Sequence, residues 1–101
     1  MRGEGGNAVR EDRQSESLAS VGTETDRKWN TVVLNDAVNE QTYVTYVFRT
    51  HFGYARSKAH ALMMQVHTQG RAIVSCDGRE TAESHVGAMH EFGLLAILEE
   101  A

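Results

Sequence analysis

The chain has 101 residues and a formal net charge of -4, and it contains no apolar stretch approaching the roughly 20 residues that a membrane span requires. Its length predicts one compact domain, and its negative charge does not favour binding to nucleic acid or to an anionic membrane. The single cysteine, Cys76, excludes an internal disulfide and fits a reducing compartment, so we expect a cytoplasmic protein.

The first part of the chain, residues 1–26, is predicted to be a disordered tail. It is rich in glycine, serine, threonine and charged residues, and its few apolar residues cannot offset the entropy of an ordered chain. Such a tail is either a passive solvated segment or one that engages a partner, and the sequence leaves both interpretations open. We expect the folded domain to comprise residues 27–101.

The folded part is predicted to begin with a strand at Trp29–Leu34, which has the aromatic and β-branched content of strands. After a turn, Asn39 is expected to cap a helix that has Glu40 in its first turn and runs to about Phe52. The stripe of this helix that faces the core is predicted to consist of Val44, Val47, Phe48 and Phe52.

Two more helices and two more strands complete the predicted domain. A helix beginning near Arg56 leads into a short apolar strand at residues 72–74, and a helix beginning near Arg79 precedes a last strand at residues 94–98. Residues 99–101 are expected to be a solvated end. The apolar positions expected to face inward on these two helices are Ala59, Leu62, Met63, Val66, Ala82, Val86 and Met89. The glycines expected to end the three helices are Gly53, Gly70 and Gly93.

This order of strand, helix, helix, strand, helix, strand predicts a small two-layer α+β domain. The sequence gives little support to catalysis, because no nucleophile signature and no defensible pair of carboxylates is present. A metal site is not expected either, since His60 and His67 would lie about 10 Å apart on one helix and Cys76 has no second cysteine. We therefore expect a protein that is not an enzyme, with no cofactor and no bound metal.

His67 is the most informative polar residue, because it follows Val66 at the edge of an apolar stripe just before a helix ends. Such a ring is either a hydrogen-bonded core histidine or part of a binding site. Asn35 and Asp36 come directly after the first strand, where their oxygen atoms either shape a turn or accept hydrogen bonds from a cation. Were His67 beside them, three acceptors would surround one ammonium group.

Apolar residues are placed to line the space next to such an ammonium group. Val44, Met63 and Val66 would form this wall, and methionine adapts to side chains of different shape. A free α-amino group followed by a large apolar side chain matches this combination of acceptors and apolar wall.

Three stretches resemble the ClpS family, the adaptors of the ATP-dependent Clp protease. They are Leu34-Asn35-Asp36, the segment from Thr42 to Phe48, and the segment from Met63 to Ala72, with its signature V-H-x-x-G-[KR]-A. The resemblance covers about residues 29–101. The residues of the first motif are similar to those of ClpS proteins from the actinobacterial branch of the family. It implies a ClpS-like fold, in which a three-stranded antiparallel sheet packs against three helices.

The resemblance implies an adaptor that binds proteins with a destabilising N-terminal residue, Leu, Phe, Tyr or Trp, known as N-degrons. By position in the motifs, Asn35, Asp36 and His67 would hold the α-amino group, and Asn39 would contact the peptide backbone. The matching residues of the hydrophobic pocket are Val44, Met63, Val66 and Leu94. The family pattern departs at Ala37, where many members have an acidic residue, and at Gln41, where a methionine is common.

The resemblance also implies a second partner, the N-terminal domain of a ClpA- or ClpC-type AAA+ unfoldase. Glu80 matches the family's docking glutamate, and His85 replaces a nearby basic residue. We expect a monomer that receives substrates and delivers them to this unfoldase. The alternative is an interaction module of the same fold with another partner, such as a stalk-like assembly domain, which would need no ammonium-binding group.

Overall fold

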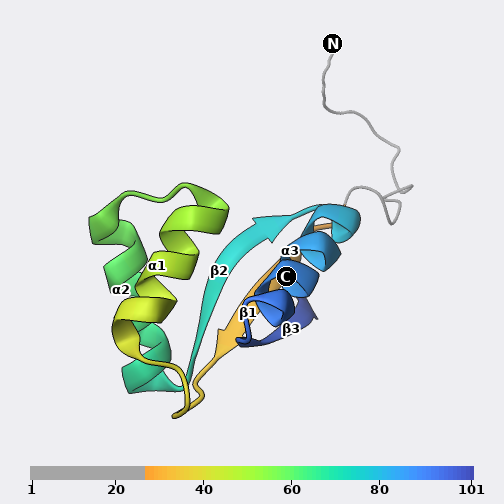
Figure 1. Ribbon diagram of the computed structural model, residues 1–101. Helices are drawn as coiled ribbons and strands as arrows, with labels where there is room; N and C mark the ends of the chain where they lie inside the picture. The colour runs from red at the N-terminus through yellow and green to blue at the C-terminus, as the bar shows by residue number, and fades with distance from the viewer. Residues whose placement is uncertain (1–26) are drawn as a thin grey trace.

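The structure, a computed structural model, describes residues 27–101. The expected tail, residues 1–26, lies outside the described residues, so neither its predicted disorder nor a role for it is tested. The described chain forms three strands and three helices in the predicted order (Figure 1). The elements are β1 (Trp29–Leu34), α1 (Gln41–Phe52), α2 (Arg56–Gln69), β2 (Arg71–Asp77), α3 (Arg79–Glu91) and β3 (Leu95–Glu100).

The strand that comes first in the chain lies at the centre of the sheet. The strand order is β2-β1-β3, and both neighbours of β1 run antiparallel to it. Leu34, at the end of β1, pairs with Arg71 on one side and with Leu95 on the other. The end of β1 is therefore held from both sides, and the residues that follow it leave the sheet from a fixed point. The predicted three-stranded antiparallel sheet is confirmed.

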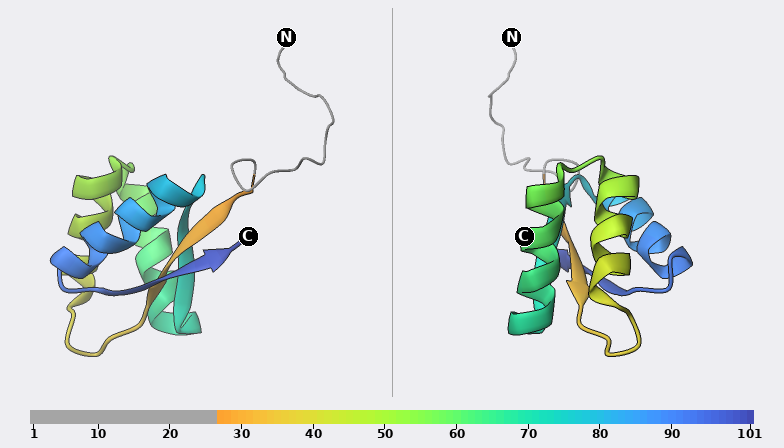
Figure 2. Two further views of the ribbon diagram at one scale, coloured as in Figure 1. Left: turned by 90° about the vertical axis from the view of Figure 1, so that its right-hand side faces the viewer. Right: turned by 60° about the vertical axis from the view of Figure 1, so that its left-hand side comes forward.

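The helices cover one face of this sheet. Helix α2 packs on β2, α3 packs on β1 and β3, and α1 packs against α2 (Figures 1 and 2). Along β2 and β3, buried Ala72, Val74 and Ala96 alternate with exposed Ile73 and Ile97, as expected for strands with one covered and one solvated face. The buried side chains join the helices in one core, which is centred on Phe48, Met63 and Met89 and closes the two layers.

The predicted helix ends at Gly53 and Gly70 are confirmed. Both residues have a positive φ, 73° and 89°, and their backbone N–H groups donate to Arg49 O and Val66 O. A residue with a Cβ would be strained in this left-handed conformation, which explains glycine at these positions. Because Gly70 turns the chain directly into β2, the last turn of α2 lies next to the sheet.

Two local predictions are wrong. The residue that precedes α1 as its cap is Glu40, and the Asn39 side chain makes no capping bond. Instead Asn39 Nδ2 donates to Gly93 O at 3.2 Å, a contact between distant parts of the chain that outweighs local capping. The last strand is also longer than predicted, since Glu99 and Glu100 belong to β3 and pair with Arg71 and Arg27.

No helix within residues 27–101 is long and apolar enough to cross a membrane.

Candidate functional site

A small hollow lies where the end of β1, the start of α1, the second half of α2 and the residue before β3 meet. Its volume is about 20 Å³, which is room for one water molecule. The residues that line it are Val33, Leu34, Asn35, Asp36, Asn39, Gln41, Val44, Met63, Val66, His67 and Leu94. The structure therefore brings together the three predicted ammonium-binding residues, the four predicted pocket residues and Asn39.

One end of the hollow carries unused hydrogen-bond acceptors. The backbone N–H of Asn35 donates to Gly70 O at 3.0 Å, which fixes Asn35 beside the last turn of α2, where His67 lies. Both side chains are exposed, and within residues 27–101 neither makes a hydrogen bond. The interpretation of His67 as a buried core histidine is therefore wrong. Its ring and the Asn35 amide can accept hydrogen bonds from a ligand.

Asp36 has two roles in this geometry. Its Oδ1 accepts a hydrogen bond from the Val38 N–H at 3.0 Å, and its backbone oxygen accepts one from the Asn39 N–H at 3.0 Å. These bonds shape the loop between β1 and α1, as one of the two sequence interpretations proposed. The second carboxylate oxygen makes no hydrogen bond within the described residues, and it adds negative charge to the end of the hollow where Asn35 lies.

The other walls of the hollow are apolar. Val44, Met63, Val66 and Leu94 are all buried, so only small parts of their surfaces face the free space. Val33 and Leu34 from β1 extend this wall, and sequence reasoning placed them only in the strand. Their position directly before Asn35 was the available signal, because the last residues of a strand lie near the loop that follows it.

Leu94 is held in the wall by contacts from α3, from α1 and from the loop before α1. The backbone N–H of Leu94 donates to Met89 O at 3.0 Å, Asn39 donates to the preceding Gly93, and the Tyr43 hydroxyl donates to Phe92 O at 2.6 Å. Three hydrogen bonds thus fix the short connection between α3 and β3. The placement of Leu94 follows from these contacts and not from its own strand, since β3 begins one residue later.

The predicted docking residues, Glu80 and His85, lie on α3 and do not line the hollow. Glu80 is exposed in the first turn of α3, whereas His85 is partly buried and contacts two other side chains. His85 Nδ1 lies 2.8 Å from His51 Nε2, and His85 Nε2 lies 3.6 Å from Asp77 Oδ2. Burial, together with the neighbouring His85, lowers the pKa of His51 below its ordinary value, because both disfavour the protonated ring.

The described part of the chain contains no group of side chains suited to a metal centre. No three histidine, cysteine, aspartate or glutamate side chains of residues 27–101 are grouped so that they could hold a metal ion. Cys76 is exposed, and it lies on the edge strand β2. The chemistry that the hollow supports is therefore hydrogen bonding to a donor at one end and apolar contact beside it.

The model of one protein family matches most of the described chain. It is described as "ATP-dependent Clp protease adaptor protein ClpS", and it matches residues 24–96. The chain belongs to the ClpS family. The matched range contains every residue that lines the hollow, together with Glu80 and His85.

Relatives from actinobacteria have similar sequences. The chain is 53% identical over 77 residues to the ATP-dependent Clp protease adapter protein ClpS of Streptomyces coelicolor, with 76% of this chain and 80% of that protein covered. It is 47% identical over 76 residues to the protein of that name from Mycobacterium tuberculosis, with 75% of each chain covered. The predicted family is thereby confirmed.

A solved structure has the same fold. It is that of Agrobacterium tumefaciens ClpS2 bound to L-phenylalaninamide, with a TM-score of 0.69 and 25% sequence identity. The similarity covers 74% of this chain and 98% of that chain. The ligand of that ClpS2 is an amino acid amide with a free α-amino group and an aromatic side chain. These are the two features that acceptors and an apolar wall would recognise.

Proposed function

We propose that this member of the ClpS family binds the N-terminal residue of substrate proteins in the hollow and delivers those proteins to a Clp unfoldase. One observation carries the proposal: Asn35, Asp36 and His67 line the same hollow as a wall of buried apolar side chains. An α-ammonium group has three N–H donors, and these three side chains supply its acceptors. The adjoining wall then receives the first side chain of the substrate.

The apolar wall favours Leu, Phe, Tyr or Trp as this first side chain. A space of about 20 Å³ is smaller than any of them, so wall atoms must move when a substrate binds. Met63 is suited to this movement, because its unbranched thioether side chain adopts many shapes. Val44, Val66 and Leu94 supply the remaining apolar contact, and Asn39 lies at the rim, where the substrate backbone would leave.

Delivery requires a second surface, which we assign to α3. Glu80 presents a carboxylate at the exposed N-terminal end of this helix, away from the hollow, so both partners can bind together. The partner is the N-terminal domain of a ClpA- or ClpC-type unfoldase. His85 contacts His51 and Asp77. We assign it a supporting role, in which it holds α3 in place and does not contact the unfoldase itself. The protein acts as a cytoplasmic monomer without catalysis of its own.

The alternative function, assembly with another partner through the same fold, does not use the acceptors of Asn35 and His67. Binding of a peptide with N-terminal Phe, compared with the same peptide after N-acetylation, distinguishes the two functions. Acetylation removes the charge and leaves the acceptors unpaired. It should therefore weaken binding by about 2–4 kcal/mol, on the scale of hydrogen bonds to charged groups. Equal affinity for both peptides would contradict the proposal.

Two histidines of α2 provide a matched pair of variants for this experiment. His67→Ala should lower affinity for the free peptide and narrow its difference from the acetylated peptide. His60→Ala removes an exposed histidine of the same helix that does not line the hollow, and it should leave that difference unchanged. Glu80→Lys should leave peptide affinity intact and weaken unfoldase binding, most strongly at low salt.

A further inference from the structure

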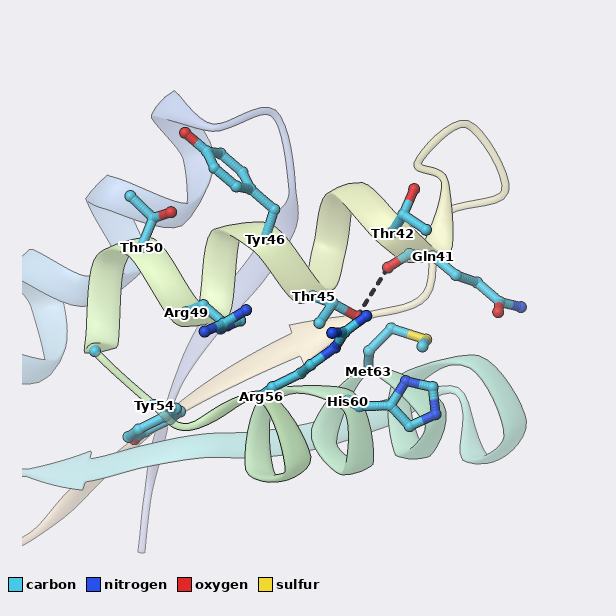
Figure 3. Close-up of a pocket in the computed structure, with 11 residues that line it drawn as sticks. Gln41, Thr42, Thr45, Tyr46, Arg49, Thr50, Tyr54, Arg56, His60 and Met63 are labelled. Atoms are coloured by element: carbon cyan, nitrogen blue, oxygen red, sulfur yellow. Dashed lines mark hydrogen bonds between the residues drawn. The ribbon is translucent and has the colours of Figure 1, made fainter.

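A second and larger cavity lies beside the hollow, between α1 and α2. It is a groove of about 820 Å³ (Figure 3). The residues that line it are Gln41, Thr42, Thr45, Tyr46, Arg49, Thr50, Gly53, Tyr54, Arg56, His60 and Met63. Most of these side chains are polar, so the groove suits an extended peptide more than a buried apolar group.

Among the described residues, the charged side chains that line this groove are basic, although the whole chain has a formal net charge of -4. Arg56 reaches from α2 toward α1, while Arg49 lies on α1 and His60 lies further along α2 (Figure 3). Among residues 27–101, no carboxylate lines the groove. Within residues 27–101, neither guanidinium group forms a hydrogen bond or an ion pair. Arg71, by contrast, pairs with Glu99 across the sheet.

The groove adjoins the hollow, because Gln41 and Met63 line both. A peptide whose first residue lies in the hollow would therefore reach the groove by crossing these two side chains. Arg49 lies eight residues beyond Gln41, and Arg56 lies seven residues before Met63. At 1.5 Å per helical residue both lie about 10–12 Å from the shared rim. This distance spans about three to four residues of extended chain.

We propose that the groove binds the segment that follows the N-terminal residue of the substrate, and that Arg49 and Arg56 favour acidic side chains at its third to fifth residues. This proposal rests on the proposed function of the hollow. Substrates with the same first residue would then differ in affinity according to the charge of the next few residues.

The test measures binding of labelled peptides to the full chain by fluorescence anisotropy at low salt. All peptides begin with Phe, and they carry Glu, Gln or Lys at residues three to five, each with a free or an acetylated N-terminus. Wild-type protein should bind the Glu peptide about three- to tenfold more tightly than the Gln peptide, and the Lys peptide most weakly. High salt should reduce this preference, because it screens exposed charges.

Matched variants assign the preference to the two arginines. Arg49→Gln and Arg56→Gln should each reduce it, and the double variant should bind the Glu and Gln peptides equally. Lys28→Gln lowers the net charge equally at an exposed position outside the groove, and it should keep the wild-type preference.

The outcomes separate the two proposals. Equal affinity of free and acetylated peptides would overturn the function of the hollow. A clear requirement for the free N-terminus without any charge preference, or with a preference that survives in the double variant, would overturn the role of the groove alone. Tighter binding of every peptide by the double variant would also overturn it, since the groove would then be occupied by an acidic segment of this chain or of a second copy.

Discussion

His51 Nε2 on α1 and His85 Nδ1 on α3 lie 2.8 Å apart, so one of the two rings donates a hydrogen bond and the other accepts it. The accepting nitrogen must be unprotonated. Burial and the neighbouring His85 lower the pKa of His51 in the folded protein, whereas in the unfolded chain its pKa is about 6.5. As the pH falls through this value, the unfolded chain takes up a proton before the folded protein does.

The free energy of unfolding should therefore decrease as the pH falls below about 6.5, because the unfolded state then binds more protons. The contribution of His51 is fully present above this pH. Urea denaturation at about pH 7.5 and 5.5 measures the decrease. His51→Gln should make it smaller, and His60→Gln, an exposed histidine on α2, should leave it as in the wild type. An unchanged decrease in His51→Gln would assign the acid sensitivity to other groups.

Met63→Ala should change both stability and substrate preference. Met63 is 3% exposed, and truncation of a buried methionine costs about 2–5 kcal/mol of unfolding free energy. In the hollow, the lost side chain no longer crowds a branched Cβ, so peptides that begin with Ile or Val should gain relative to Leu. Isothermal titration calorimetry of the three peptides measures this ranking.

Met89→Ala is the control for stability. Met89 is fully buried in the same core, but it lies on α3 outside the hollow. This variant should lose stability and keep the wild-type ranking of Leu over Ile and Val. If both variants had the same ranking, Met63 would not control entry to the hollow.

Asn39→Ala should weaken peptide binding more than it weakens the fold. It removes the bond to Gly93 O and a polar group at the rim of the hollow, at a cost of about 1 kcal/mol in unfolding free energy. Tyr43→Phe removes the neighbouring bond to Phe92 O without altering the lining. If both variants weakened binding equally, Asn39 would act only by fixing the loop before Leu94.

Two glycine substitutions should have opposite effects on stability. An added Cβ would meet no atom within 4 Å at Gly70 or at Gly87, so space does not distinguish them. Gly70 has a φ of 89°, and Gly70→Ala should cost about 1 kcal/mol or more. Gly87 lies within α3, and Gly87→Ala should stabilise by about 0.4–1 kcal/mol. Thermal unfolding of both variants measures the two shifts.

Local patterns in the sequence were sufficient to predict the order of the elements. The stop at Gly70 and the stripe containing Ala59, Met63 and Val66 are local properties, and they determine α2 and its buried face. Residue chemistry suggested the acceptors and the apolar wall, and the likeness of the motifs to a known family added Asn39 and Leu94. These predicted binding residues meet in one hollow because β1 ends beside the last turn of α2, with the Asn35 N–H bonded to Gly70 O.

The errors and omissions concern contacts between distant residues. Asn39 has the composition of a helix cap, but its amide is used by Gly93, 54 positions later. Glu99 looked like a solvated end, yet it pairs with Arg71 across the sheet. The groove was missed for the same reason, since Arg49 and Arg56 lie on different helices and become neighbours only when those helices pack.

The central position of β1 has a consequence for the order in which the hollow is assembled. A ribosome makes the N-terminal part of a chain first, so β1 leaves the ribosome early, whereas Leu94 and its second partner strand, β3, emerge much later. Until then the hollow lacks one wall and β1 has an unpaired edge. A chain that lacks β3 would therefore present Asn35 and His67 without the wall that Leu94 supplies. The hollow is whole only when segments from both ends of the described chain have met in the sheet.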